Sequence, residues 1–316
     1  MQNGYVLIIG SSNMDLNIYS KQLPNPGETV TGGTFKQFLG GKGANQAVAS
    51  VRSGAITTFI AKIGKDGFGD QMITRFSEEG IDTSHIIRDS QEASGVAFIL
   101  IDDFGENMIS VAPGANARLS KIDVGKVEDI IKNASVLVVQ MEIPIETIEE
   151  IYNIASQGNV IKILNPAPLK TIPLRMLKNI DIIVPNEGEL FRLHSLLNMK
   201  ELFGEGREKI IQASMDIVDL GVKTIITTLG SKGSLIYEKN KDQAFDVPAF
   251  KVKAIDTVGA GDCFNGVLAS KLFQGENLIN AVKYATAAAS IAVTRKGAQE
   301  SMPFVEEIEE RYKKLN

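Results

Sequence analysis

The segment AIDTVGAGDCFNGVLAS (254–270) holds the clearest indication of chemistry, a glycine turn that leads directly into an apolar-periodic helix. We expect this helix to begin at Asp262. In such a turn the backbone N–H groups of residues 259–261 can converge on a phosphate, and the helix dipole favours negative charge at the same end. A helix capped by Asp262 with no ligand is the alternative. A second carboxylate six residues upstream, Asp256, favours the anion site.

A second glycine cluster, FLGGKGANQAVAS (38–50), surrounds Lys42 just before another predicted helix. Its glycines let the backbone approach a ligand closely beside a cationic side chain. The alternative is a turn that carries a surface lysine. Asn45, which follows the glycines, makes the ligand site the slightly better interpretation.

Polar groups also follow several predicted strands. In GSSNMDLN (10–17), Asn13 and Asp15 lie two residues apart and share a face if the chain stays extended. A carboxylate accepts two hydrogen bonds at once, so Asp15 suits a vicinal diol, although an Asx turn explains the same residues. Glu142 and Asn186 come at the ends of two further apolar runs, where a helix-leading glutamate and a turn asparagine are the alternatives.

The segment TTLGSKGS (227–234) has two interpretations, a hairpin turn or a glycine bend around a nucleotide. The common phosphate fingerprints are absent, because the chain has no GxxxxGK(S/T) motif and Gly259, Gly261 and Gly266 do not make GxGxxG. The chain is therefore neither a Walker-type NTPase nor a plain dinucleotide-binding dehydrogenase.

The composition excludes further classes of protein. The 316 residues include 33 Lys and Arg against 38 Asp and Glu, so the net charge of −5 argues against binding to nucleic acid or to an anionic membrane. One cysteine excludes an intramolecular disulfide, and two histidines leave acid–base work to carboxylates. No apolar run approaches the ~18 residues of a membrane helix. The single cysteine fits a reducing compartment, so we expect a cytoplasmic protein.

The elements that must position these residues alternate along the chain. Strands are predicted at 5–10, 57–64, 136–140, 160–164, 181–186 and 224–230, and helices at 43–54, 68–79, 146–156, from 187, and at 262–272, 278–294 and 305–314. Runs that are hydrophobic at successive positions suit parallel strands buried on both faces. We therefore expect one α/β domain over 1–316, with a doubly wound, mainly parallel sheet flanked by helices.

Two segments, 15–41 and 94–116, break this alternation, because they are typical of strands and turns with no helix between them. Paired as one small β-sheet beside the ends of the main strands, they would form a lid over a site there. An ordinary β extension explains the pattern equally well. Their exposed strands could also pair with a second copy, which predicts a homodimer.

Nine segments, in order along nearly the whole chain, resemble the ribokinase family of carbohydrate kinases. They are GSSNMDL, PNPGETV, GGKGANQAVA, QMEIP, LNPAP, VPNEGE, TTLGSKG, DTVGAGDCFNG and AVTRKGAQESMP. Each is weak alone, but their joint order and spacing are specific. The resemblance implies transfer of the γ-phosphoryl group of ATP to the 5-hydroxyl of D-ribose, with a lid over the sugar.

The resemblance also implies roles for individual residues. Asp262 would be the base that takes the hydroxyl proton, and the anion hole would be formed by the amides of Gly259, Ala260, Gly261 and Asp262. The sugar would be held by Asn13, Asp15, Gly41, Lys42, Asn45, Glu142 and Asp262. ATP would contact Asn186, Thr227, Thr228, Leu229, Gly230, Ser231, Lys232, Gly261 and Thr286. Thr286 departs from the family, which often has His or Asn there near the adenine.

Two cations complete what the resemblance implies. Mg²⁺ would be arranged through residues 186–189, with Glu189 acting through water. K⁺ would bind Asp256 and Ser301 together with the backbone carbonyls of Val258, Ala292, Arg295 and Gly297. The alternatives are a related kinase for deoxyribose, a nucleoside or fructose, and a sugar-binding regulator that has lost turnover.

Overall fold

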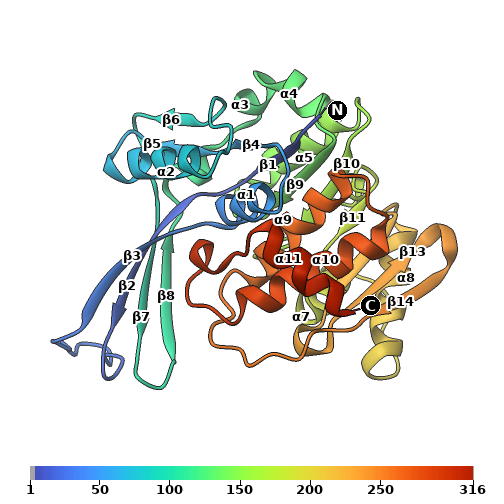
Figure 1. The fold of residues 1–316 in the computed structure, drawn as a ribbon. Helices are drawn as coiled ribbons and strands as arrows, with labels where there is room; N and C mark the ends of the chain where they lie inside the picture. The colour runs from blue at the N-terminus through green and yellow to red at the C-terminus, as the bar shows by residue number, and fades with distance from the viewer. Residues whose placement is uncertain (1–3, 316) are drawn as a thin grey trace.

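The computed structural model describes residues 4–315, and its largest element is an eight-stranded sheet (Figure 1). Its strands are β1 (Val6–Ile9), β4 (Thr57–Ile60), β9 (Val136–Gln140), β10 (Ile161–Asn165), β11 (Ile182–Ile183), β12 (Thr224–Thr228), β13 (Ser234–Glu238) and β14 (Gln243–Val247). Their order is β14-β13-β12-β11-β10-β9-β1-β4. All pairs from β12 to β4 are parallel, and β13 and β14 extend one edge antiparallel.

The central strands are apolar at successive positions because helices cover both faces of the sheet. In β1, Val6 and Ile8 pack into one core, and Leu7 and Ile9 pack into the other. The first core is covered by α1 (Lys42–Arg52), α2 (Gly67–Glu78), α9 (Ala260–Phe273), α10 (Leu278–Ala292) and α11 (Val305–Tyr312). The second is covered by α3 (Lys121–Gly125), α4 (Glu128–Lys132), α5 (Ile145–Ala155), α6 (Leu174–Leu177), α7 (Glu187–Leu196) and α8 (Gly206–Asp219). The doubly wound, mainly parallel α/β fold is thus confirmed.

Two smaller sheets accompany the main one. The four-stranded sheet contains β2 (Asn13–Tyr19), β3 (Thr34–Gly40), β7 (Gly95–Ile101) and β8 (Asn107–Ala112), in the order β3-β2-β7-β8. The segments 15–41 and 94–116 therefore do pair with each other, and their sheet projects away from the helices (Figure 1). The two-stranded sheet pairs β5 (Lys62–Gly64) with β6 (Ile87–Asp89). Short 3-10 turns are η1 (Gly114–Arg118), η2 (Gly230–Lys232), η3 (Lys239–Lys241), η4 (Gln299–Ser301) and η5 (Lys313–Leu315).

Two local predictions are corrected. The helix expected from Asp262 begins at Ala260, because Gly259, with φ of 73°, supplies the left-handed N-cap that a residue with a side chain rarely adopts. The single strand expected over 57–64 is two strands, because β4 is the edge of the main sheet and the chain leaves it to pair with β6. Within residues 4–315, no helix has the length and apolar character that crossing a bilayer requires.

Candidate active site

Asp262 lies in the first turn of α9 with its carboxylate held between two amide side chains. Asn45 Nδ2 donates to Oδ2 at 3.0 Å, and Gln46 Nε2 donates to Oδ1 at 2.9 Å. Asp262 does not cap the helix, since Gly259 occupies the N-cap position. Only 6% of Asp262 is exposed, so these amides fix the direction in which its remaining lone pairs point.

A chain of buried amides supports this arrangement from behind. Gln46 Oε1 accepts a 2.6 Å hydrogen bond from Gln140 Nε2, and Gln46 Nε2 also lies 3.2 Å from Asn165 Oδ1. Gln299 Nε2 donates to Asn45 Oδ1 at 3.2 Å. Because Gln140 and Asn165 end β9 and β10, the carboxyl edge of the main sheet sets the position of the Asp262 carboxylate.

The glycines around Lys42 explain how α1 reaches this point. Gly41 has a φ of 88°, and a Cβ there would lie 2.7 Å from Ser12 Cα. A Cβ on Gly43 would lie 2.7 Å from the backbone carbon of Gly10. Both glycines therefore let the first turn of α1 pack directly on the chain that follows β1. The close approach expected for a ligand is, at these positions, an approach of backbone to backbone.

Glu142 and Lys42 lie beside that junction. Glu142 Oε2 accepts a hydrogen bond from Lys42 N at 3.0 Å and another from Ser11 Oγ. The nearby carboxylate of Asp262 raises the pKa of Lys42, and Glu142 and Glu189 add to this effect against the opposing effect of burial. Lys42 therefore stays charged within a cluster of carboxylates, where it can bind an anion or a hydroxyl.

Asn13 and Asp15 begin β2 and lie on one face of it, as their spacing predicted. Asn13 Oδ1 accepts from Asn116 Nδ2 at 2.8 Å, and Asn116 also binds the backbone of Ser12. Burial raises the pKa of Asp15 from 3.8 to about 7, with further contributions from Glu142, Glu300 and Asp262. The structure thus brings Asn13, Asp15, Lys42, Asn45, Glu142 and Asp262 to one region.

A cavity of about 490 Å³ opens beside the first turn of α9. Of the nucleotide residues predicted, Thr228, Gly230, Ser231, Gly261 and Thr286 line it. Its remaining wall is mainly apolar and includes Phe250, Val252, Phe264, Ala289 and Val293. Thr227, Leu229 and Lys232 do not line the cavity. The segment 227–234 turns between antiparallel β12 and β13, as the hairpin interpretation predicted, and part of it borders this cavity. Its contact with a nucleotide stays a prediction.

Asn186 and Glu189 cap α7 reciprocally. Asn186 Oδ1 accepts from Glu189 N at 2.8 Å, and Glu189 Oε2 accepts from Asn186 N at 2.9 Å. A backbone bridge places Asn186 beside Thr228 at the cavity rim. The second carboxylate oxygen of Glu189 has no recorded hydrogen bond within residues 4–315, so the cap leaves it able to hold a cation-bound water.

Asp256 joins the two loops that were predicted to bind a monovalent cation. Its carboxylate accepts from Val258 N and from Gly297 N, both at 3.0 Å. Ser301 Oγ, which is buried, donates to Ala298 O and keeps its lone pairs. Ala292 and Arg295 belong to the same connection, since Arg295 N donates to Ala292 O. The atoms that would coordinate the cation are all oxygens, which suits a hard cation.

Several contributors to this region were not predicted from the sequence. They are Gln46, Asn116 and Ser11, and the supporting amides Gln140, Asn165 and Gln299. Gln46 lies within the GGKGANQ segment, so its motif was recognised, but only Gly41, Lys42 and Asn45 were assigned roles there. Asn116 contacts Asn13, which is 103 positions away in the sequence, and Ser11 contacts Glu142, which is 131 positions away. Only the folded chain brings such partners together.

The site thus has a carboxylate fixed at the start of a helix that follows a glycine turn. Polar groups and an apolar cavity lie beside it at the carboxyl edge of a doubly wound sheet. This is the arrangement of an α/β phosphotransferase. The chain belongs to the pfkB family of carbohydrate kinases, whose model matches residues 3–305.

Individual relatives agree with this assignment. The ribokinase of Staphylococcus aureus is 40% identical over 305 residues, which cover 96% of this chain and 98% of the relative. The deoxyribokinase of Salmonella typhi is 36% identical over 312 residues, which cover 98% and 99%. The structure of Arabidopsis thaliana ribokinase complexed with ribose and ATP matches with a TM-score of 0.91 at 30% identity and 99% coverage of both chains.

Proposed function

We propose that the protein transfers the γ-phosphoryl group of ATP to the 5-hydroxyl of D-ribose, giving D-ribose 5-phosphate and ADP. The observation that carries this proposal is the Asp262 carboxylate, fixed by Asn45 and Gln46 at the start of α9 between the polar cluster and the cavity. The relatives named ribokinase identify the acceptor. Asp262 takes the hydroxyl proton as bonding to phosphorus develops, so a weak but well-placed base is sufficient.

The acceptor would lie against the cluster around Asp262. Asn13, Asp15 and Glu142 offer carboxylate and amide oxygens for the sugar hydroxyls, and Lys42 and Asn45 offer donors. Gly41 would contact the sugar through its backbone. A ligand that lacks one hydroxyl would leave a buried polar group unpaired, which favours ribose over deoxyribose. Asn116 holds Asn13 and so positions this set.

The donor ATP would place its base in the cavity and its phosphates at the start of α9. The first-turn amides of a helix have no acceptor within the helix, so the amides of Gly259, Gly261 and Asp262 can stabilise the transferring group. Ala260 N donates to Thr257 O at 3.3 Å and would have to leave that acceptor to join them. The base and ribose of ATP would contact the lining residues Thr228, Gly230, Ser231, Gly261 and Thr286. Thr227, Leu229 and Lys232 belong to the same turn, and a backbone bridge places Asn186 beside Thr228. Mg²⁺ would offset part of the phosphate charge, and Glu189 would hold one of its waters.

A monovalent cation would bind behind the anion hole. Asp256, Ser301 and the carbonyls of Val258, Ala292, Arg295 and Gly297 supply the oxygen ligands. Potassium is the cation that the family resemblance implies. Because Asp256 bridges Val258 and Gly297, an occupied site would stiffen the loops that flank Gly259.

The four-stranded sheet would act as the lid. By register, one face of this sheet carries Phe35, Ile18, Phe98 and Met108, which are 56%, 37%, 54% and 52% exposed. A second copy would cover this apolar surface, so we propose a homodimer formed through the lid. We further propose one domain over 1–316, of which residues 1–3 and 316 lie outside the described part, and a cytoplasmic location.

The experiment is ADP release by purified protein with ATP and Mg²⁺, comparing ribose, deoxyribose, fructose and adenosine with and without K⁺. Ribose-dependent release that rises with K⁺ is expected. Preference for deoxyribose, fructose or adenosine would retain the chemistry and replace the acceptor. Binding of ribose with no release above background would identify a sugar-binding regulator instead.

A further inference from the structure

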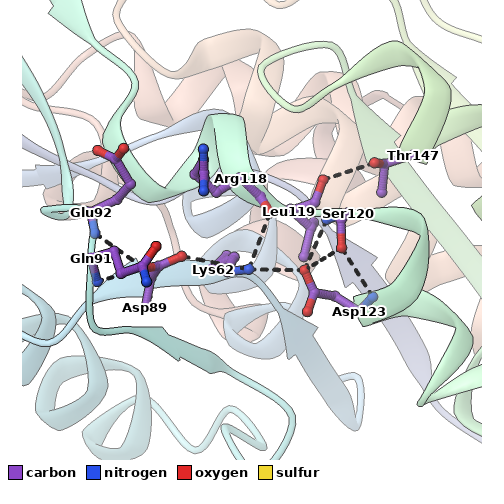
Figure 2. A network of polar contacts seen from close by, with 9 residues as sticks. All are labelled: Lys62, Asp89, Gln91, Glu92, Arg118, Leu119, Ser120, Asp123 and Thr147. Atoms are coloured by element: carbon purple, nitrogen blue, oxygen red, sulfur yellow. Dashed lines mark hydrogen bonds and ion pairs between the residues drawn. The ribbon is translucent and has the colours of Figure 1, made fainter.

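A second and larger cavity, of about 740 Å³, lies outside the proposed acceptor and nucleotide sites. It is bordered by β5 and β6, by the end of η1, by the start of α3 and by the start of α5. None of the residues proposed to bind sugar, ATP or cations lines it. Figure 2 shows a polar network that includes several of its lining residues, among them Lys62, Asp89 and Leu119.

Charged side chains of both signs line this cavity. Four lining side chains are cationic, Lys62, Arg88, Arg118 and Lys121, and two are anionic, Asp89 and Glu146. Counted together with Asp123 and Asp70, which pair with two of these cations, the two signs balance.

Two of the four cations are already neutralised. Lys62 Nζ lies 3.0 Å from Asp123 and 3.5 Å from Asp89, and Arg88 pairs with Asp70 at 2.8 Å. Arg118 and Lys121 make no ion pair with any carboxylate in the part of the chain that the structure describes. Their charges are therefore available to a ligand.

Apolar surface lies beside these charges. Ile122 follows Lys121 directly and is 73% exposed, although it is a large hydrophobic residue. Ile87 and Pro144 add further apolar lining. An inorganic ion would leave this surface in water, whereas an organic anion with an apolar part would cover it.

The frame that carries Arg118 and Lys121 is held by hydrogen bonds, so it is formed before any ligand arrives. Lys62 Nζ donates to Arg118 O at 3.1 Å, and Thr147 Oγ1 donates to Leu119 O at 2.8 Å (Figure 2). Ser120 caps α3 reciprocally with Asp123. A preformed frame lowers the entropic cost of binding.

The same frame continues into the proposed acceptor site. Asn116, which binds Asn13, lies two residues before Arg118 in the chain. On the other wall, Glu142, which binds Lys42 N, lies four residues before Glu146. Leu119 and Thr147 join the two walls through one hydrogen bond. A ligand that draws these two walls together would therefore also shift the segments that carry Asn116 and Glu142, which contact the proposed acceptor site.

We propose that this cavity is a second ligand site, which binds a small organic anion with a phosphate or carboxylate group on an apolar scaffold and links its occupancy to the acceptor site. Arg118 and Lys121 bind the anionic group, and Ile122 contacts the apolar part. Such linkage is reciprocal. The factor by which the bound anion changes the affinity for ribose equals the factor by which bound ribose changes the affinity for the anion.

The test is titration calorimetry on the full chain saturated with ADP, Mg²⁺ and ribose, so that the proposed active site is already occupied. The probes are phenyl phosphate, benzoate and inorganic phosphate, which separate the anionic group from the apolar part. Phenyl phosphate or benzoate is expected to bind once per chain and more tightly than inorganic phosphate. The double variant R118E/K121E is expected to weaken binding at least about tenfold.

The control is K126E/K178E, which makes the same charge change at two exposed lysines outside the cavity. Ile122→Ser is expected to weaken phenyl phosphate and leave inorganic phosphate unchanged. No binding of any probe at millimolar concentration, or equal binding by R118E/K121E and the wild type, would overturn the site. Calorimetric ribose affinity that phenyl phosphate leaves unchanged would overturn the linkage. Neither readout requires turnover, so failure of the proposed phosphoryl transfer would be recognised separately.

Discussion

Gln46 Nε2 donates a 2.9 Å hydrogen bond to Oδ1 of Asp262, across 216 positions of sequence. The same side chain accepts from Gln140 at the end of β9. Gln46 therefore connects the sheet to the carboxylate that we propose as the base. It touches no substrate in this account and acts through Asp262, so it is a positioning residue.

Gln46→Leu is expected to lower kcat about 10–100-fold with little change in ribose KM, because a misplaced base costs rate more than binding. Gln140 loses its hydrogen-bond acceptor, so the free energy of unfolding should fall by about 1–3 kcal/mol. Steady-state kinetics and thermal unfolding measure these effects. Gln157→Leu, at an exposed position, is the control. An unchanged kcat would show that Gln46 does not position Asp262.

Asp15 should make ribose binding depend on pH, because the pKa of its carboxyl is raised to about 7. Below that value the carboxyl is protonated and loses acceptor capacity. Ribose affinity should then fall by up to about tenfold per pH unit. Calorimetry at pH 6 and pH 8 measures this change. Asp15→Asn should bind more weakly at pH 8 and show no such dependence, and an equal dependence in that variant would assign it to another group.

The same shift affects the stability of the ligand-free protein. The folded-state pKa of Asp15 lies above its reference value of 3.8, so the folded chain holds more protons between pH 4 and pH 7. The contribution of Asp15 to the free energy of unfolding therefore falls as pH rises through that window. The change in melting temperature caused by Asp15→Asn should be a few degrees more positive at pH 8 than at pH 4. A pH-independent effect of the substitution would contradict the raised pKa.

Ala289 lines the cavity that we assign to the nucleotide. Ala289→Phe would place a ring in that space, so the KM for ATP should rise at least about tenfold, while calorimetric ribose affinity stays unchanged. A melting curve checks that the variant folds. Equal loss of ATP and ribose binding in a folded variant would argue against separate donor and acceptor sites.

Potassium activation would depend on the carboxylate of Asp256, which bridges Val258 and Gly297. Asp256→Asn removes the charge and leaves one of the two backbone N–H groups without its acceptor, so activation should be lost and the rate in KCl should fall to the potassium-free rate of the wild type or below it. The rate is followed as KCl replaces choline chloride at constant ionic strength. Full activation of the variant would place the cation elsewhere.

The sequence predicted most of the strands because their apolar runs are buried on both faces, and β9 has the bounds expected from VLVVQ, 136–140. It did not predict where α9 begins, because that depends on the backbone conformation of Gly259. It also did not predict that Asn45 and Gln46 hold the Asp262 carboxylate. Gln46 reaches Asp262 only because Gly43 lets α1 touch the backbone of Gly10, and this contact depends on tertiary packing.

The central claim is that Asp262 is the base of an ATP-dependent ribose kinase, and Asp262→Asn tests it most directly. The measurement pairs ribose-dependent ADP release with calorimetric ribose binding on the same sample, after a melting curve has confirmed folding. We predict that turnover falls at least about 100-fold while ribose affinity changes little, since the amide keeps the shape of the carboxylate and cannot accept the proton. Turnover near that of the wild type would contradict the account.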